Sequence, residues 1–325
     1  MRVGQNPQKK VQGVVKPERI TVAVLNYIPF VGGFYTQMPE VLKVCLNSLR
    51  ENTEVPFDLL VFDNGSCEEM VQYLVDERNR GNIQYLMLSE KNLGKGGAWN
   101  VMLDGAPGEI IAYGDNDIYY RKGWLKASLD LLETYPRAGM VTARPIRLDL
   151  PVSAATLAWA GNTPEASLEE GAFLSWETFK TFNESLGKFE QLDEQYEQGK
   201  DWRISYLGRE ALAGASHWQF LAYKQVVKQF LPFDMDRPMG QVINFDRRID
   251  EAGYLRLMTM QPYAVNLSNT LNNVAEVPEL TVKGSAAPAK KQGLGQKILQ
   301  VGLIKRVLFK LYDKLFDWYF RSDVG

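Results

Sequence analysis

The stretch Ile110-Ile-Ala-Tyr-Gly-Asp-Asn-Asp117 is an apolar run that ends in two carboxylates one residue apart. Its first half is typical of a buried strand, and its end is typical of the rim of a sheet. The apolar runs 20–25, 58–62 and 83–88 have the same character, and the second of them leads directly into Asp63. These runs predict strands with polar side chains at their carboxyl ends.

Amphipathic segments separate these strands. The spacing of their apolar residues predicts helices over 39–52, 68–80 and 98–103. Strands that alternate with helices predict an α/β fold, with a mostly parallel sheet that helices cover on both faces. In such sheets the ligand lies at the carboxyl ends of the strands. Asp63, Asn92 and Asp115 all follow strands, so we expect the ligand site at this edge.

Bulk composition excludes several classes of protein. The chain has 325 residues, 45% of them hydrophobic and 23% charged, with a formal net charge of -2. This is the balance of a soluble globular protein, and without a basic patch in its body we expect no nucleic-acid partner. No run is long and apolar enough to span a bilayer. Two cysteines cannot build a disulfide framework, which is consistent with a reducing cytoplasm.

Asp115 and Asp117 suit a divalent cation. Carboxylates are hard oxygen ligands, and Mn²⁺ or Mg²⁺ binds through one or two of them together with substrate phosphates. Such an ion would neutralise the charge that develops on a departing nucleoside diphosphate. An acidic loop that is merely solvated is the alternative, and the position directly after a strand favours the metal site.

Five pieces of the first half together resemble glycosyltransferase family 2. They are Val24-Leu-Asn-Tyr27, Val61-Phe-Asp-Asn-Gly-Ser66, Glu90-Lys-Asn-Leu-Gly-Lys-Gly-Gly-Ala-Trp-Asn100, Asp115-Asn-Asp-Ile118 and Gly123-Trp-Leu125. They occur in the order of that family and at similar spacings, over roughly residues 20–150. The resemblance implies a GT-A-like, Rossmann-like fold that binds a nucleotide sugar.

The resemblance also implies roles for single residues. The expected donor-binding residues are Asn26, Tyr27, Asp63, Asn92, Gly94, Lys95, Asp115 and Asn116. Asp63 would hold the base or the ribose, although an aspartate before Asn-Gly also forms turns. Gly94 would permit a close backbone approach to the nucleotide. Lys95 would reach a phosphate, with an exposed lysine as the alternative. Asp115 would contact the ribose or the sugar and share the metal with Asp117.

The catalytic base is open between three carboxylates of the second half. Members of the family place an acidic pair before an Arg-rich helix that ends in Ala-Gly-Tyr. The aligned positions of this chain hold Gln241, Val242 and Asn244. We expect Asp246 to be the base, with Asp234 and Asp236 as alternatives, because an inverting transfer needs a carboxylate within reach of the acceptor hydroxyl. If none of them lies there, a retaining mechanism becomes the better hypothesis.

His217 is the only histidine of the chain and follows the small residues Ala213-Gly-Ala-Ser216. Some GT-A enzymes complete the metal shell with a histidine from the second half. The expected metal ligands are therefore Asp115, Asp117 and His217. A histidine that is only packed or hydrogen-bonded is the alternative.

We expect five segments along the chain. They are a flexible tail over 1–19, a nucleotide-sugar-binding half over 20–150, an acceptor-side half with a helical insertion over 151–280, a linker over 281–296 and an amphipathic helix over 297–325. The insertion, over 165–201, is expected to be mostly helical and to pack on the sheet domain, with a mobile lid as the alternative. The C-terminal helix is basic and rich in aromatic residues, so it would contact a membrane surface or pack on protein, including a second copy.

The sequence thus predicts a metal-dependent glycosyltransferase that uses Mn²⁺ or Mg²⁺. The donor would be a nucleotide sugar and the acceptor a saccharide or a lipid-linked molecule, with inversion as the outcome that the resemblance implies. We expect a cytoplasmic protein, peripheral at the inner face of the membrane if the C-terminal helix binds lipid. The alternative is a catalytically inactive nucleotide-sugar-binding partner or regulatory protein, which the missing acidic pair supports.

Overall fold

The computed structural model describes residues 5–11, 13–147, 153–236, 242–271 and 314. The chain forms two units, Met1–Val277 and Pro278–Gly325, and the described helices and strands of the fold belong to the first. The predicted linker over 281–296 and the predicted amphipathic helix over 297–325 lie outside the described residues, apart from Lys314. Within the described part of the chain, no helix is long and apolar enough to cross a membrane.

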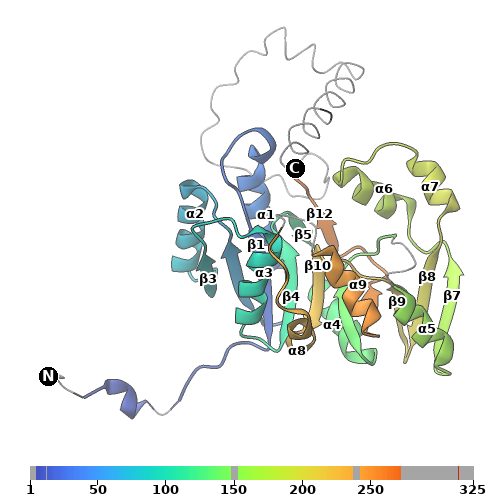
Figure 1. Ribbon diagram of the computed structural model, residues 1–325, viewed down its shortest axis with the longest axis horizontal. Coiled ribbons are helices and arrows are strands. Elements are labelled where there is room, and N and C mark those ends of the chain that lie inside the picture. Colours follow the sequence, from blue (N-terminus) through green and yellow to red (C-terminus); the bar gives the residue numbers. More distant parts are fainter. Residues whose placement is uncertain (1–4, 12, 148–152, 237–241, 272–313, 315–325) are drawn as a thin grey trace, which may run out of the picture. The chain divides into compact units, whose positions relative to one another are not determined.

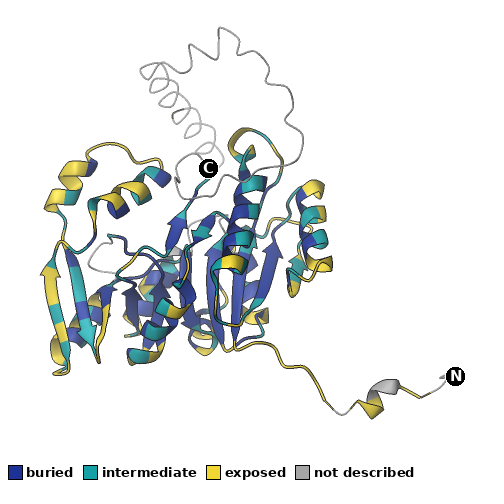
Figure 2. Cartoon of the chain, turned by 180° about the vertical axis from the view of Figure 1, so that it is seen from behind, coloured by how far each residue is buried: buried dark blue, intermediate teal, exposed yellow. Residues whose placement is uncertain are grey.

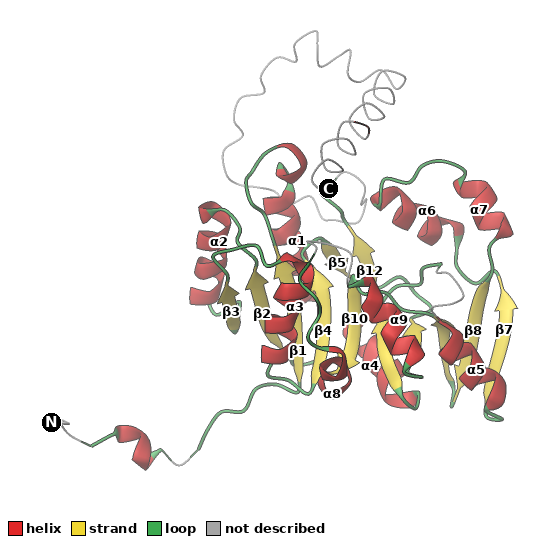
Figure 3. Ribbon diagram, in the orientation of Figure 1, coloured by secondary structure: helices red, strands yellow, loops and turns green. Residues whose placement is uncertain are grey.

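A ten-stranded sheet forms the centre of the first unit (Figures 1 and 3). In spatial order its strands are β3 (Tyr85–Leu88), β2 (Asp58–Asp63), β1 (Ile20–Asn26), β4 (Ile110–Asp115), β10 (Gln219–Tyr223), β6 (Ala138–Thr142), β11 (Leu255–Met258), β9 (Arg209–Ala213), β8 (Asp201–Tyr206) and β7 (Ala166–Gly171). The strands β3, β2, β1 and β4 are parallel to one another, and so are β6 and β11. Strand β10 runs antiparallel between β4 and β6. The predicted α/β fold is confirmed, and the parallel strands bring their carboxyl ends to one edge.

Helices cover both faces of the sheet. The helices of the described residues are α1 (Met38–Asn52), α2 (Glu68–Asn79), α3 (Gly94–Gly105), α4 (Trp124–Thr134), α5 (Ala154–Asn162), α6 (Trp176–Ser185), α7 (Leu192–Gln198), α8 (Lys224–Val227) and α9 (Ile243–Glu251), with 3-10 turns η1 (Pro7–Lys10), η2 (Gly33–Tyr35) and η4 (Lys228–Phe230). Val22 of β1 belongs to the core that α1 and α4 cover, whereas Ala23 belongs to the core with Trp99 of α3. Because β1, β2 and β4 are buried on both faces, these strands are continuous apolar runs (Figure 2).

A second, small sheet pairs β5 (Ile118–Tyr120) with β12 (Ala264–Asn266) in antiparallel register. The backbone N–H of Leu267 donates to the carbonyl of Asp117 at 2.7 Å. Strand β12 and the residue after it are therefore fixed beside the Asp-Asn-Asp segment.

Helix α3 begins at Gly94, four residues earlier than the sequence indicates. The predicted start at Ala98 was wrong. It followed from the poor helix propensity of the glycines before Ala98, which nevertheless belong to the helix. The tertiary reason for the glycines is close packing, since a Cβ on Gly96 would lie 2.8 Å from the carbonyl oxygen of Asp234. Asn100 fixes the same segment by donating to the Phe233 carbonyl at 2.8 Å and accepting from its N–H at 2.6 Å.

The predicted helical insertion over 165–201 begins with a strand instead. Residues Ala166–Gly171 form β7, which pairs with β8 so that Leu168 lies opposite Ile204. Pairing with the distant strand β8 outweighs the local helix propensity of this segment, because tertiary contacts commonly override intrinsic propensity. The helices α6 and α7 follow, and Phe189 between them is 68% exposed.

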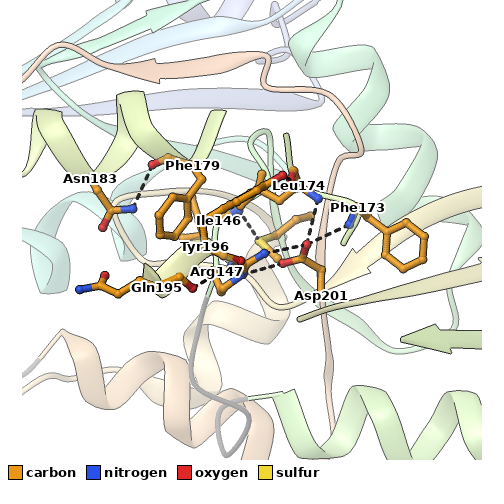
Figure 4. A network of polar contacts seen from close by, with 10 residues as sticks. Ile146, Arg147, Phe173, Leu174, Phe179, Asn183, Gln195, Tyr196 and Asp201 are labelled. Carbon is orange, nitrogen blue, oxygen red and sulfur yellow. Dashed lines mark hydrogen bonds and ion pairs between the residues drawn. The ribbon is translucent and has the colours of Figure 1, made fainter. Parts of the chain in front are cut away.

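An ion pair fastens α6 and α7 to the sheet (Figure 4). Arg147 Nε lies 3.0 Å from Asp201 Oδ1, and Arg147 Nη1 donates to the carbonyl of Tyr196 at 2.9 Å. The other oxygen of Asp201 accepts from the backbone N–H groups of Phe173 (3.0 Å) and Leu174 (2.9 Å). The side chain of Asp201 is 5% exposed, so these contacts favour a packed insertion over a mobile lid.

Candidate functional site

Three side chains join the carboxyl ends of β1, β2 and β4. Asn26 Nδ2 donates to Asp63 Oδ2 at 2.8 Å, and Asn116 Nδ2 donates to Asn26 Oδ1 at 2.7 Å. Asn26 Nδ2 also lies 3.1 Å from Ser66 Oγ, which accepts from the Ile28 N–H. All three side chains are buried, so the structure brings these predicted donor-binding residues to one edge of the sheet.

Asp63 has a turn-forming role in this structure. Its Oδ1 accepts from the backbone N–H groups of Gly65 (3.2 Å) and Ser66 (2.9 Å), and its Oδ2 accepts from Asn26. The residue is fully buried. Its carboxylate therefore shapes the loop after β2, and direct contact with a nucleotide stays a prediction.

The loops after β2 and β3 hold each other. Asn64 Oδ1 accepts from the Leu93 N–H at 2.9 Å, and Asn64 Nδ2 donates to Asn92 Oδ1 at 3.0 Å. Asn92 Oδ1 also accepts from the Gly94 N–H at 2.8 Å. Gly65 has a φ of 88°, and a Cβ there would lie 3.0 Å from the backbone nitrogen of Asn92. Asn92 itself is exposed, in the loop that follows β3.

Lys95 is buried, which contradicts the alternative of an exposed lysine. Its Nζ lies 2.8 Å from each carboxylate oxygen of Asp115 and 5.6 Å from the ring centroids of Trp99 and Tyr113. The Tyr113 hydroxyl donates to Asp115 Oδ1 at 2.5 Å, and burial raises the pKa of this hydroxyl well above its usual value. Asp115 is thus held by the Lys95 ammonium and the Tyr113 hydroxyl.

Asp117 lies half-buried just beyond the end of β4. The pKa of its carboxyl is raised from 3.8 to about 7, chiefly by burial and then by the charge of Asp115, while Lys95 acts in the opposite direction. A bound cation would remove this unfavourable charge, so the donor chemistry of the pair fits Mn²⁺ or Mg²⁺. Among the described residues, no three His, Cys, Asp or Glu side chains lie close enough to hold a metal ion, so the set with His217 stays a prediction.

Tyr27 begins the loop between β1 and α1. The residue is half-buried, and its ring centroid lies 6.3 Å from that of Tyr35 in an edge-to-face arrangement. In the same loop Phe30 and Phe34 are 57% and 60% exposed. The structure thus places Tyr27 at the carboxyl end of β1, next to exposed aromatic side chains.

The three predicted base candidates lie in different surroundings. Asp246, on α9, is buried, and its Oδ2 lies 2.5 Å from Nδ1 of His217. Its Oδ1 lies 3.1 Å from Nη2 of Arg256. Asp234 and Asp236 are exposed, and the Asp234 backbone lies against the first turn of α3. Both oxygens of Asp246 are engaged, which makes it the least accessible of the three.

Sequence reasoning missed Tyr113 and Arg256. Tyr113 stands two residues before Asp115 on the same strand, so the period of a strand places both side chains on one face. Arg256 is a lone cation in the apolar strand Leu255–Met258, and buried charges need a partner. These signals were present in the sequence, although neither identifies the partner across the fold.

Comparisons with known proteins bear on the first half of the chain. Residues 33–169 match the model of the family described as Glycosyl transferase family 2, which confirms the resemblance over those residues. No curated protein matches the chain.

Among solved structures the likenesses are distant. TarS of S. aureus with UDP-GlcNAc is 14% identical, with a TM-score of 0.44 over 76% of this chain and 58% of that chain. The mannosyltransferase PcManGT of Pyrobaculum calidifontis with GDP-Man and Mn²⁺ is 16% identical, with a TM-score of 0.44 over 76% and 58%. GalNAc-T7 with UDP, GalNAc and Mn²⁺ is 12% identical, with a TM-score of 0.46 over 80% and 47%. The chain spans less than two thirds of the length of each of these proteins.

Proposed function

From the match of residues 33–169 to glycosyl transferase family 2, we propose that the protein is a glycosyltransferase that takes its sugar from a nucleotide-sugar donor. The supporting observation is the carboxyl edge of the parallel strands, where Asn26, Asp63 and Asp115 converge from β1, β2 and β4. Open α/β sheets bind ligands at this edge. Lys95, in the first turn of α3, adds a cation beside helix N–H groups, a combination that suits a diphosphate.

We propose that the transfer depends on Mn²⁺ or Mg²⁺ held by Asp117, with Asp115 as the second ligand. The ion would stabilise the negative charge of the leaving nucleoside diphosphate. Tyr113 and Lys95 orient the Asp115 carboxylate before any ligand arrives. Asp117 carries the raised pKa, so it is the carboxylate whose ionised form gains most from a cation.

For an inverting transfer, the geometry favours Asp234 over Asp246 as the base. Asp246 already contacts His217 and Arg256 with its two oxygens, whereas Asp234 is exposed. The Asp234 backbone lies against Gly96 in the first turn of α3, one residue from Lys95. A base must reach the acceptor hydroxyl directly or through one water, and an exposed carboxylate beside the donor edge meets that need.

The alternative function is a nucleotide-sugar-binding protein without transferase activity. It is favoured by Gln241, Val242 and Asn244, which stand where the family has its acidic pair. Both functions predict binding of a nucleotide sugar. They differ in whether the bond between sugar and diphosphate is ever broken.

The two functions separate in a binding and turnover experiment. A thermal-shift panel of nucleoside diphosphates and nucleotide sugars, with and without Mn²⁺, should show a metal-dependent shift for one nucleotide. A ligand at about a hundred times its Kd stabilises the folded state by about 2.7 kcal/mol. Donor hydrolysis or transfer should accompany binding, disappear in Asp117→Ala and persist in the control Asp104→Ala, an exposed carboxylate on α3.

Either of two results would change the conclusion. Binding without hydrolysis or transfer to any saccharide or lipid-linked acceptor would favour the inactive partner. A folded sample that shifts with no nucleotide would overturn both functions.

We propose a cytoplasmic protein whose residues 297–325 contact the inner face of the membrane. These residues combine Val301, Leu308 and Leu315 with Lys310 and Lys314 in their sequence, a composition that suits an anionic lipid surface. The full chain should co-sediment with anionic vesicles at low salt and remain in solution with neutral ones. Equal behaviour with both kinds of vesicle would contradict the proposal, and a concentration-dependent dimer would favour protein packing.

A further inference from the structure

The loop between β1 and α1 is apolar and uncharged, although it lies at the surface (Figure 1). From Asn26 to Pro39 the sequence contains no Asp, Glu, Lys, Arg or His. Within the loop, Phe30 is 57% exposed, Val31 45% and Phe34 60%. These three side chains are called the apolar loop patch. Contiguous exposed apolar side chains mark surfaces that bind another molecule or a membrane, because their contact with water is unfavourable.

Hydrogen bonds from two distant segments fix the backbone of this loop. The carbonyl of Ile28 accepts from the Cys67 N–H, before α2, at 2.9 Å. Nδ2 of Asn269 donates to the carbonyl of Phe34 at 3.0 Å. The loop therefore keeps its form without a bound partner, so burial of its side chains in another phase loses little backbone entropy.

Tyr35 supports the two phenylalanines of the patch. Its half-buried side chain packs against the core that contains α1. Its ring centroid lies 5.3 Å from that of Phe30 and 5.2 Å from that of Phe34, in edge-to-face arrangements. Both phenyl rings thus rest on a fixed tyrosine and still leave more than half of their surface to solvent.

The described chain of the first unit ends at this same loop. Leu271 is the last residue of the segment 242–271, and its N–H donates to Oε1 of Gln37 at 3.2 Å. The residues that follow include the sequence of 297–325, which combines apolar side chains with lysines. A single apolar anchor gives only marginal membrane binding, and stable attachment takes a second, basic signal. The loop patch supplies the apolar signal, and the sequence after Leu271 supplies the basic one.

We propose that the apolar loop patch inserts into the interfacial region of a phospholipid bilayer, with Phe30 and Phe34 as the inserting side chains. Protein–protein interfaces surround their apolar core with a polar rim. Here a loop without charges presents aromatic and aliphatic side chains alone, which is what the boundary between headgroups and acyl chains accepts.

Insertion of the loop brings the donor edge to the membrane. The loop follows directly on Asn26, and the residue before Asn26 pairs with Asp115 across the sheet. The apolar loop patch and the Asp-Asn-Asp segment therefore belong to the same edge. The substrate class that follows, an acceptor linked to a lipid, rests on the proposed function. The insertion itself does not depend on that function.

Co-sedimentation of the full chain with vesicles of phosphatidylcholine and phosphatidylserine measures the contribution of the patch. Phe30→Ser combined with Phe34→Ser should weaken binding about 10- to 100-fold, because each phenyl ring contributes up to about tenfold when it leaves water. Salt does not screen apolar burial, so the same factor should appear at low and at higher salt. A factor that vanishes at higher salt would overturn the inference.

The matched control is Leu207→Ser, which should leave vesicle binding unchanged. Leu207 is 68% exposed and lies in the turn between β8 and β9. The hydroxyl of Tyr135, three residues before β6, donates to the carbonyl of Arg209 in this hairpin at 2.8 Å. Leu207 thus belongs to the edge where β6 begins, opposite the donor edge. Equal losses in the control and in the loop variant would overturn the inference.

A leucine variant separates insertion from a structural role of the rings. Phe30→Leu combined with Phe34→Leu keeps apolar side chains and removes the edge-to-face contacts with Tyr35. It should bind vesicles within about threefold of the wild-type chain, since leucine and phenylalanine lose similar free energy in water. A loss as large as that of the serine variant would show that the rings only shape the loop.

A fluorescent label reports the insertion directly. Phe34→Cys in a Cys67→Ser background, with Cys45 buried, carries one nitrobenzoxadiazole group in place of the phenyl ring. Its emission should shift to the blue with vesicles and be quenched by nitroxide-labelled lipids, whereas the same label at Leu207→Cys should not respond. Unchanged emission on a chain that sediments with vesicles would overturn the inference, because another surface then makes the contact.

The same label identifies other occupants of the patch. Blue emission without vesicles would show that the chain or a second copy already covers the patch, and a shift with a nucleotide sugar alone would assign it to the donor. Either result overturns the insertion. A chain that binds no vesicles overturns it as well, while the thermal shift with nucleotide sugars still decides the proposed function.

Discussion

Replacing Asp117 by asparagine should make the stability of the protein less dependent on pH. The carboxyl of Asp117 has a pKa of about 7 in the folded protein and 3.8 as the ordinary value, because burial and the charge of Asp115 disfavour its ionised form. Below the ordinary value both states are protonated and the carboxyl costs nothing. As pH rises to about 7 the unfolded chain ionises first, so the folded state loses stability, and the loss is complete above that pH.

The magnitude follows from the shift. Each pH unit over which only the unfolded state is ionised costs about 1.4 kcal/mol. Between about pH 5 and about pH 8, only the two pH units from 5 to 7 lie below the pKa of the folded protein. The free energy of unfolding of the wild-type protein should therefore fall by up to about 3 kcal/mol over this range. Asp117→Asn has no carboxyl to ionise. Its stability relative to wild type should therefore rise by this amount between the two pH values.

Urea unfolding of both proteins at the two pH values measures the effect. Subtracting the difference between variant and wild type at the lower pH from that at the higher pH cancels any pH-independent cost of the substitution. The matched control is Asp104→Asn, an exposed carboxylate whose pKa is lowered by its hydrogen bond from Lys228. It is ionised at both pH values in both states, so it should show no such change. If Asp117→Asn gains nothing at the higher pH, burial does not govern this carboxyl and the reasoning on the metal site fails.

Three further outcomes follow from other contacts. Gly65→Ala should lower the free energy of unfolding by about 2–3 kcal/mol in urea unfolding, because a positive φ and a backbone contact at 3.0 Å act together. Gly81→Ala, with a φ of 83° in open space, should lower it by only about 1 kcal/mol, which is the cost of the backbone strain alone. Equal costs would contradict the close approach. Mn²⁺ affinity should fall about tenfold per unit below about pH 7, since a proton on Asp117 competes with the cation, and a flat profile in an electron paramagnetic resonance titration would exclude that competition. Arg147→Met leaves a buried carboxylate unpaired and should speed amide hydrogen exchange in α6 and α7 but not in β1; unchanged exchange would argue against the anchored insertion.

Local pattern predicts the parallel half of the fold well. β1, β2 and β4 are apolar because helices cover both faces, and α1 and α2 carry clear helical spacing. The same rule explains why Asp63 and Asp115 could be placed at one edge before the structure was known. The start of α3 and the strand β7 could not be predicted, because a glycine-rich turn and an acidic segment adopt these forms only through packing and pairing with distant residues.

The second half of the site was less accessible to sequence reasoning. His217 and Asp246 are 29 residues apart, and only the packing of α9 on the sheet brings them together. Asp246 was expected to face the acceptor, because a carboxylate near the family's acidic pair suggests a base. The sequence contains no sign that Arg256, ten residues further on, takes the other oxygen.

The hydrogen-bonded link from Asp63 through Asn26 to Asn116 has a thermodynamic consequence for recognition. The three loops that would touch a donor are immobilised when the chain folds. Their conformational entropy is therefore lost on folding, before any ligand binds. Association then loses mainly the motion of the ligand itself. A substitution such as Asn26→Ala should accordingly weaken donor binding chiefly through a less favourable entropy of binding. Calorimetry would then show a changed binding entropy and a nearly unchanged binding enthalpy.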